Sequence, residues 1–136
     1  MSNDGDLTRR ERGAAVIRRL NRGRPQPALE ALRARFPLLA HGIESYALGE
    51  VWAETTLDDR TRQIATVAAF AALGEIDTLE IHVRYALNVG VTPSELADVV
   101  ALTTVHAGFP RAIEAAETIG RILDEVDGPD SDATAT

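Results

Sequence analysis

Residues 56–108 contain start and stop signals for three helices in series, and a histidine lies in each of the last two. Thr56, with the two aspartates that follow Leu57, suits a helix start, and Gly74 suits a left-handed helix end. The segments 77–80 (DTLE) and 92–95 (TPSE) match capping boxes, and the second has proline at the first helical position. Helices so closely spaced must bury their apolar faces against one another, so we expect functional side chains between helices.

Composition restricts the fold to helices. The chain has 136 residues, of which 45% are hydrophobic and only 4% aromatic, and it is rich in alanine. This combination favours close-packed helices over a sheet sandwich. We therefore expect an all-α fold with one compact domain of six to seven helices at residues 1–126, including an Arg-rich helix at 7–22. No large apolar residue follows Val126, which predicts a disordered acidic tail at 127–136.

Apolar periodicity predicts the buried face of each helix. The helix after Pro37 is expected to bury Ile43, Tyr46, Ala47, Val51 and Trp52. The next two are expected to bury Ile64, Val67, Ala68 and Ala71, and then His82, Tyr85, Ala86 and Val89. The last helix, Pro110 to Val126, is expected to bury Ala112, Ala115, Ala116, Ile119, Ile122, Leu123 and Val126. His82 therefore shares the inward face of its helix.

Charge and cysteine content exclude several classes of function. Residues 1–35 hold nine Arg and four acids, whereas residues 36–136 hold five Arg and seventeen acids. The basic segment lacks interleaved aromatic residues and the whole chain is acidic, so we expect no nucleic-acid binding. No apolar run is long enough to span a membrane and no signal peptide is evident, which predicts a cytoplasmic protein. The chain has no cysteine, so it has no thiolate chemistry.

Four sequence motifs resemble those of the carboxymuconolactone decarboxylase family, whose relatives include the alkylhydroperoxidase D-type proteins. They are D-x-R-T-R at a helix start, A-A-L-G at its end, H-V-R-x-A-L-N-x-G-V-T, and A-G-F-P. The resemblance runs from about Leu38 to Val126. It implies an antiparallel helical fold, a homo-oligomer, with a trimer or hexamer favoured, and a pocket close to a subunit interface that is lined by His82.

The peroxidase branch of this superfamily uses a C-x-x-C pair before the histidine and a glutamate one helix earlier. When His82 is aligned on that histidine, Glu75 and Thr78 occupy the cysteine positions and Gln63 occupies the glutamate position. An amide cannot relay a proton as a carboxylate does. The resemblance therefore implies a member without cysteine peroxidase activity.

Candidate site residues follow from their chemistry together with the resemblance. The catalytic candidates are His82 as acid or base, Glu50 to orient an imidazole, and His106, which replaces a residue that is often tyrosine in relatives. The candidate substrate-binding residues are Tyr46, Trp52, Arg62, Gln63 and Arg84. Both arginines could instead form interhelical salt bridges. The three histidines lack the spacing of a metal site and no phosphate-binding loop is present, so neither a metal nor another cofactor is expected.

The resemblance implies a cofactor-free lyase that acts on a small carboxylated lactone or a related enolisable substrate, and the residue set suits this reaction. Loss of carbon dioxide leaves a dienolate, which needs one group to stabilise the oxygen and one proton donor. Two alternatives stay open. The same pocket could serve an isomerase, dehydratase or cyclase of a secondary-metabolite pathway, or the protein could be a non-catalytic oligomeric binding protein.

Overall fold

Every regular element in residues 3–128, the part of the chain that the computed structural model describes, is a helix. The all-α prediction is confirmed. Contacts between Cα atoms divide the chain into an N-terminal unit, residues 1–58, and a C-terminal unit from Asp59 onward, and each is described here by itself. The prediction of one domain stays a prediction, and residues 129–136 of the predicted tail lie outside the described part.

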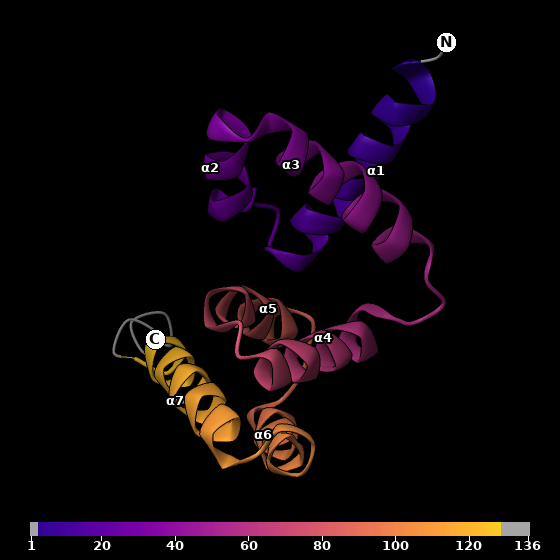
Figure 1. Ribbon diagram of the computed structural model, residues 1–136. Coiled ribbons are helices and arrows are strands. Elements are labelled where there is room, and N and C mark those ends of the chain that lie inside the picture. The colour runs from indigo at the N-terminus through magenta and orange to yellow at the C-terminus, as the bar shows by residue number, and fades with distance from the viewer. Residues whose placement is uncertain (1–2, 129–136) are drawn as a thin grey trace. The chain divides into compact units, whose positions relative to one another are not determined.

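The N-terminal unit contains four helices, shown in indigo and purple in Figure 1. They are α1 (Asn3–Leu20), α2 (Pro27–Arg35), α3 (Pro37–His41) and the π-helix η1 (Gly42–Trp52). The first helix starts earlier than the sequence predicted and ends at Leu20, because Arg22 and Gly23 both adopt positive φ values, 56° and 79°. The backbone is helical at His41 and Gly42, so α3 continues into η1.

Two glycines allow α1 and η1 to touch through their backbones. A Cβ atom on Gly13 would lie 1.9 Å from the carbonyl oxygen of Glu44, and one on Gly49 would lie 2.1 Å from the carbonyl oxygen of Arg9. Any side chain at either position would therefore force the helices apart. This close crossing fixes the core of the N-terminal unit.

The predicted buried face of η1 is only partly right: Ile43 packs against the buried residues of this unit, but Ala47 is exposed. Glu44, Ser45 and Gly49 are buried, whereas Tyr46 and Val51 are 63% and 54% exposed. The reason is the helix type: hydrogen bonds in a π-helix join residues five apart, so Glu44 and Gly49 face the same side, which an α-helical pattern does not predict.

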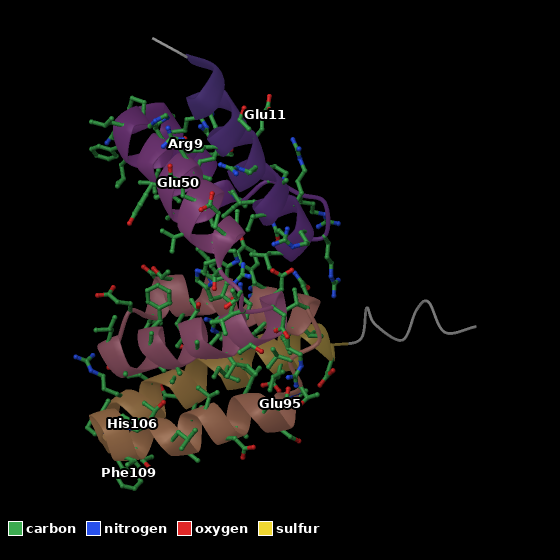
Figure 2. The ribbon with its side chains drawn as sticks, turned by 90° about the vertical axis from the view of Figure 1, so that its right-hand side faces the viewer. Arg9, Glu11, Glu50, Glu95, His106 and Phe109 are labelled. Atoms are coloured by element: carbon green, nitrogen blue, oxygen red, sulfur yellow. The ribbon has the colours of Figure 1, made fainter. Side chains whose placement is uncertain are left out.

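Arginines of α1 pair with glutamates of η1 and of the segment after it. Arg10 Nε donates to Glu44 Oε1 at 2.7 Å, and Arg33 from α2 donates to Glu44 Oε2 at 2.7 Å. Arg9 pairs with Glu50, as Figure 2 shows. Arg12 and Glu54 lie 3.6 Å apart. Four arginines of the basic segment thus pair with glutamates of their own unit.

The C-terminal unit is built around an apolar core. It contains α4 (Asp59–Leu73), α5 (Ile76–Asn88), α6 (Pro93–Ala107) and α7 (Phe109–Val126). In Figure 1 these are the helices from rose to yellow; α4 packs against the other three, and α7 also packs against α5 and α6. The buried core residues are Val67, Ala71, Leu79, Val83, Ala86, Val91, Leu96, Val99, Ala115, Ile119 and Ile122.

The sequence located most of these helices correctly. The stripes of α4 and α5 face the core, whereas Ala116 and Val126 of α7 are exposed. Gly74 ends α4 with φ 72°, as expected. At α6 the capping box is formed: Thr92 Oγ1 accepts from the Glu95 amide at 3.2 Å, and Glu95 Oε2 accepts from the Thr92 amide at 2.9 Å.

The capping box predicted for α5 is wrong. The helix begins at Ile76 with Glu75 as its N-cap, and no side chain caps it. Asp77 and Thr78 therefore lie inside the first turn. The apolar side chain of Ile76 packs against the core, which draws the helix start toward the preceding turn.

Candidate functional site

Helices α4 and α5 bring Gln63 and His82 together in the C-terminal unit. His82 Nδ1 lies 3.1 Å from Gln63 Oε1. The imidazole also stacks on Phe70 of α4, with ring centroids 5.4 Å apart, and meets the edge of Tyr85, with centroids 5.5 Å apart. An amide and two aromatic rings therefore surround the histidine.

Burial keeps the His82 imidazole neutral. Removal of the ring from water lowers the pKa of His82 from 6.5 to about 4, because the charged form loses more hydration than the neutral form. At neutral pH the ring is thus an uncharged group with one nitrogen that can accept a proton. A histidine of this kind can transfer protons once a ligand changes its surroundings.

Gln63 carries an unsatisfied polar group in the core. The residue is fully buried, yet its Nε2 atom has no hydrogen-bond partner in the described structure. A buried unpaired donor destabilises a protein by about 1–3 kcal/mol. The amide oxygen Oε1 contacts His82, so the side-chain orientation that makes this contact leaves the amide nitrogen unpaired.

The other candidates of the C-terminal unit have different surroundings. His106 is exposed in the last turn of α6, near Phe109 in Figure 2. Arg84 binds Glu125 of α7 at 2.6 Å, which is the interhelical salt bridge considered from the sequence. It also binds Glu80 of its own helix at 3.1 Å. The carboxylate of Glu125 raises the pKa of Arg84 more than any other neighbour does.

Arg62 differs from Arg84 in its exposure. Its side chain is only 11% exposed, and its guanidinium lies 3.7 Å from Asp59 on the same helix. The residue immediately precedes Gln63 in α4. The ion pair of Arg62 thus lies within one helix, whereas Arg84 also pairs with a residue of another helix.

Three further candidates lie in the N-terminal unit, on η1. Glu50 pairs with Arg9, Tyr46 is largely exposed, and Trp52 is the last residue of the helix. A cavity of about 430 Å³ also lies in this unit. Its wall contains Arg10, Ile17, Arg33 and Glu44, and both of these arginines are paired with Glu44. Its lining ends at Glu44 and includes none of the candidate residues.

Phe70 was missed from the sequence, although a signal was available. It lies seven residues after Gln63, which is two turns along the same face of α4. A polar residue, Gln63, within the apolar stripe marks the face that meets the histidine, and the next large residue on that face is Phe70. Only 4% of the residues in this chain are aromatic, so an aromatic residue on the same face as Gln63 is a candidate contact of the histidine.

Two further findings concern the described residues as a whole. No group of three His, Cys, Asp or Glu side chains among them could hold a metal ion. None of the described helices is both long and apolar enough to cross a membrane.

An all-α scaffold with a neutral, amide-bound histidine and without cysteine defines a class of protein suited to proton transfer rather than thiol chemistry. The family described as the carboxymuconolactone decarboxylase family matches residues 37–119, and the chain belongs to this family.

Individual relatives include two decarboxylases. The chain is 40% identical over 68 residues to the 4-carboxymuconolactone decarboxylase of Acinetobacter baylyi, covering 50% of this chain and 51% of the relative. It is 34% identical over 88 residues to the nitrosuccinic acid decarboxylase npaB of Metarhizium robertsii, covering 62% of each chain. An uncharacterized protein of Methanocaldococcus jannaschii is 25% identical over 95 residues, with 70% of this chain and 88% of the relative covered. The chain thus spans about half to three fifths of the two decarboxylases.

Proposed function

We propose that the protein is a cofactor-free lyase that removes carbon dioxide from a small carboxylated lactone or a related enolisable acid, with His82 as its proton-transfer group. The observation that carries this proposal is the neutral His82 imidazole held by Gln63 between two aromatic rings. Two relatives named as decarboxylases support the reaction type.

The reaction needs one proton and no cofactor. The bond between the ring carbon and the carboxylate carbon breaks, carbon dioxide leaves, and the electron pair passes through the ring double bond to the lactone carbonyl oxygen. The resulting dienolate then takes a proton at carbon from the imidazolium form of His82, which returns to its neutral form. One proton from solvent restores the imidazolium for the next turnover.

Binding of an anionic substrate supplies the charge that His82 lacks at rest. A carboxylate close to the imidazole favours the protonated ring and raises its pKa, in opposition to the effect of burial. Proton uptake therefore accompanies binding. After the carboxylate departs as neutral carbon dioxide, its negative charge stays on the dienolate, and proton transfer from the imidazolium to carbon leaves both groups neutral.

The test is a turnover assay with a γ-carboxy lactone, in which carbon dioxide release and product mass are both measured. His82→Gln should lower the turnover rate by about 10²- to 10⁴-fold, because glutamine has hydrogen-bonding capacity but cannot transfer a proton in this pH range. His41→Gln is the matched control, since it makes the same exchange in the N-terminal unit. Full activity in His82→Gln would contradict the assignment, and turnover without a change of mass would indicate an isomerase.

The remaining candidates can be ranked in the same assay. His106→Phe tests the exposed histidine, and a double variant with His82→Gln that is no slower than the slower single variant would show that the two histidines act together. Arg62→Met should raise KM more than Arg84→Met if Arg62 binds the substrate carboxylate. Glu50→Gln, Tyr46→Phe and Trp52→Phe test the three candidates on η1.

We also propose that the chain forms a homo-oligomer, a trimer or a hexamer. Support comes from exposed apolar side chains at the corner between α6 and α7, namely Leu102, Val105, Phe109 and Ile113. Exposed apolar groups gathered in this way often mark subunit contacts. Light scattering after size exclusion should give the mass of an oligomer, and Phe109→Ser should reduce it. A monomer at micromolar concentration would contradict the proposal.

A further inference from the structure

Gln63 is an exception on its own helix. The other buried residues of α4 are Val67 and Ala71, and both belong to the apolar core. Gln63 is as buried as they are, and the contact that the structure shows for its amide group is the one between Oε1 and His82 Nδ1.

Packing alone does not explain a glutamine at this position. Methionine has a similar volume and would fill the same space without an unpaired donor. The amide nitrogen of Gln63 has no hydrogen-bond partner in the described structure, so its presence weakens the core. The feature that distinguishes glutamine from methionine here is the oxygen that faces the imidazole.

We propose that Gln63 is a positioning residue that fixes His82 in the tautomer with hydrogen on Nδ1 and the lone pair on Nε2. An amide oxygen has no hydrogen and can only accept, so the nitrogen 3.1 Å from it must donate. In neutral histidine the hydrogen bond made by one ring nitrogen sets the state of the other. Nε2 is then the atom that takes up and gives back the proton.

The aromatic neighbours complete the positioning. Phe70 stacks on one face of the imidazole at an interplanar angle of 28°, and Tyr85 meets the ring at 80°. These two contacts restrict the ring plane, while the hydrogen bond to Gln63 selects between the two ring flips that share that plane. Nε2 thus has one direction relative to α4 and α5.

The amide also suits both charge states of the ring. Nδ1 carries a hydrogen in the neutral tautomer and in the imidazolium, so Gln63 Oε1 accepts the same bond before and after Nε2 is protonated. The use of Nε2 in the reaction rests on the proposed function. The tautomer itself does not, and it can be measured in the protein without substrate.

The experiment is a long-range ¹H–¹⁵N correlation spectrum of the protein labelled with ¹⁵N-histidine, recorded at a pH where the rings are neutral. The chain has three histidines, and the signals that vanish in His82→Gln identify His82. The expected result is a protonated Nδ1 and an unprotonated Nε2 for His82. A protonated Nε2 in the unmodified protein would overturn the proposal without any further variant.

Two substitutions at position 63 test the cause. Gln63→Met removes the acceptor, and a population with hydrogen on Nε2 should appear. Gln63→Glu keeps an acceptor oxygen and should retain hydrogen on Nδ1. An unchanged His82 tautomer in a folded Gln63→Met protein would show that another contact sets it. His41 and His106 serve as internal controls, because neither should change in either variant.

The spectra test the tautomer of His82 and the turnover assay tests the proposed reaction, so either proposal can be rejected without the other. The expected tautomer in a protein that releases no carbon dioxide from any carboxylated lactone would leave this inference standing and reject the proposed reaction. If the reaction is found, Gln63→Met should lower kcat more than it raises KM, because the substitution misdirects the proton-transfer atom. An equal kcat in Gln63→Met and the unmodified protein would contradict a positioning role.

Discussion

The two units of this chain are stabilised by different kinds of interaction. In the N-terminal unit, α1 and η1 touch through Gly13 and Gly49, and the carboxylate of Glu44 is buried between two arginines. In the C-terminal unit, eleven buried apolar residues from four helices and the loop before α6 form one core. In the first unit, backbone proximity and charge pairing add to a small apolar cluster around Ile17, Leu29 and Ala40, whereas a larger apolar core holds the second.

This difference explains where unusual chemistry can be found. In the N-terminal unit, Glu44, Glu50 and Glu54 each pair with an arginine. In the C-terminal unit the buried hydroxyls of Thr103 and Thr118 donate to backbone carbonyls of their own helices, whereas Gln63 contacts His82 across two helices. Removal of the buried ring from water is what lowers the pKa of His82.

The largest expected effect on stability tests the glycine crossing. Gly13→Ala should destabilise the N-terminal unit by about 3 kcal/mol, because the new Cβ would lie 1.9 Å from a backbone oxygen that cannot rotate away. Urea unfolding followed by fluorescence of Trp52, the single tryptophan, reports on this unit. Gly42→Ala is the control: no atom lies within 4 Å of its added Cβ, and a gain of up to about 1 kcal/mol is expected. Equal midpoints for the two variants would contradict the close crossing.

The second prediction concerns acid stability of the C-terminal unit. The pKa of His82 is about 4 in the folded protein and 6.5 when the ring is in water, so between these values the unfolded chain binds a proton that the folded chain does not. Stability from this group is fully present above pH 6.5 and is lost as the pH falls toward 4, by about 3 kcal/mol in total. The pKa of Glu80 is also lowered, chiefly by Arg121, and its contribution falls at more acidic pH.

Comparison of the unmodified protein with His82→Gln isolates the histidine. Urea unfolding at a series of pH values should show a weaker pH dependence between 6.5 and 4 in the variant. Hydrogen exchange of the backbone amides in α5 follows the same change locally. Parallel pH profiles for the two proteins would show that burial does not shift the pKa of His82.

The third prediction tests charge pairing in the N-terminal unit. Glu44→Gln should destabilise the protein by about 2 kcal/mol, since the buried carboxylate accepts charged hydrogen bonds from Arg10 and Arg33. The matched control is Glu54→Gln, because Glu54 and Arg12 are both exposed and 3.6 Å apart, and a change within about 0.5 kcal/mol is expected. Equal losses of unfolding free energy in the two variants would show that burial does not make the Glu44 ion pairs stronger than the Glu54 pair.

The buried faces of the C-terminal helices were easier to predict from the sequence than the buried face of η1 in the N-terminal unit. Apolar periodicity located the core faces of α4 and α5 because apolar burial determines the packing of that unit. It failed at η1, where a glutamate and a glycine face inward for ion pairing and close approach, and where the π-helical spacing changes which residues share a face. Patterns of hydrophobicity cannot predict a face that is not hydrophobic.

For the candidate site, the sequence indicated His82 because a polar residue interrupts an apolar face. Its contact with Gln63, nineteen residues away, was suggested by the family resemblance and not by periodicity. The ion pair of Glu50 with Arg9, forty-one residues away, could not be predicted, because a helical pattern does not specify which distant partner a charged residue meets. Contacts between helices depend on their packing, which single-helix patterns leave open.

The smallest expected effect compares two helix starts that the sequence predicted to be alike. Thr92→Ala should destabilise the C-terminal unit by about 1 kcal/mol, since it removes the oxygen that accepts from the Glu95 amide. Thr92→Ser keeps that oxygen and should cost much less. Thr78→Ala should not destabilise in this way, because no side chain caps α5 and Thr78 lies within its first turn, where alanine is the better helix former. Thermal unfolding measured by circular dichroism compares all three variants, and equal losses at positions 78 and 92 would mean that α5 does have a threonine cap.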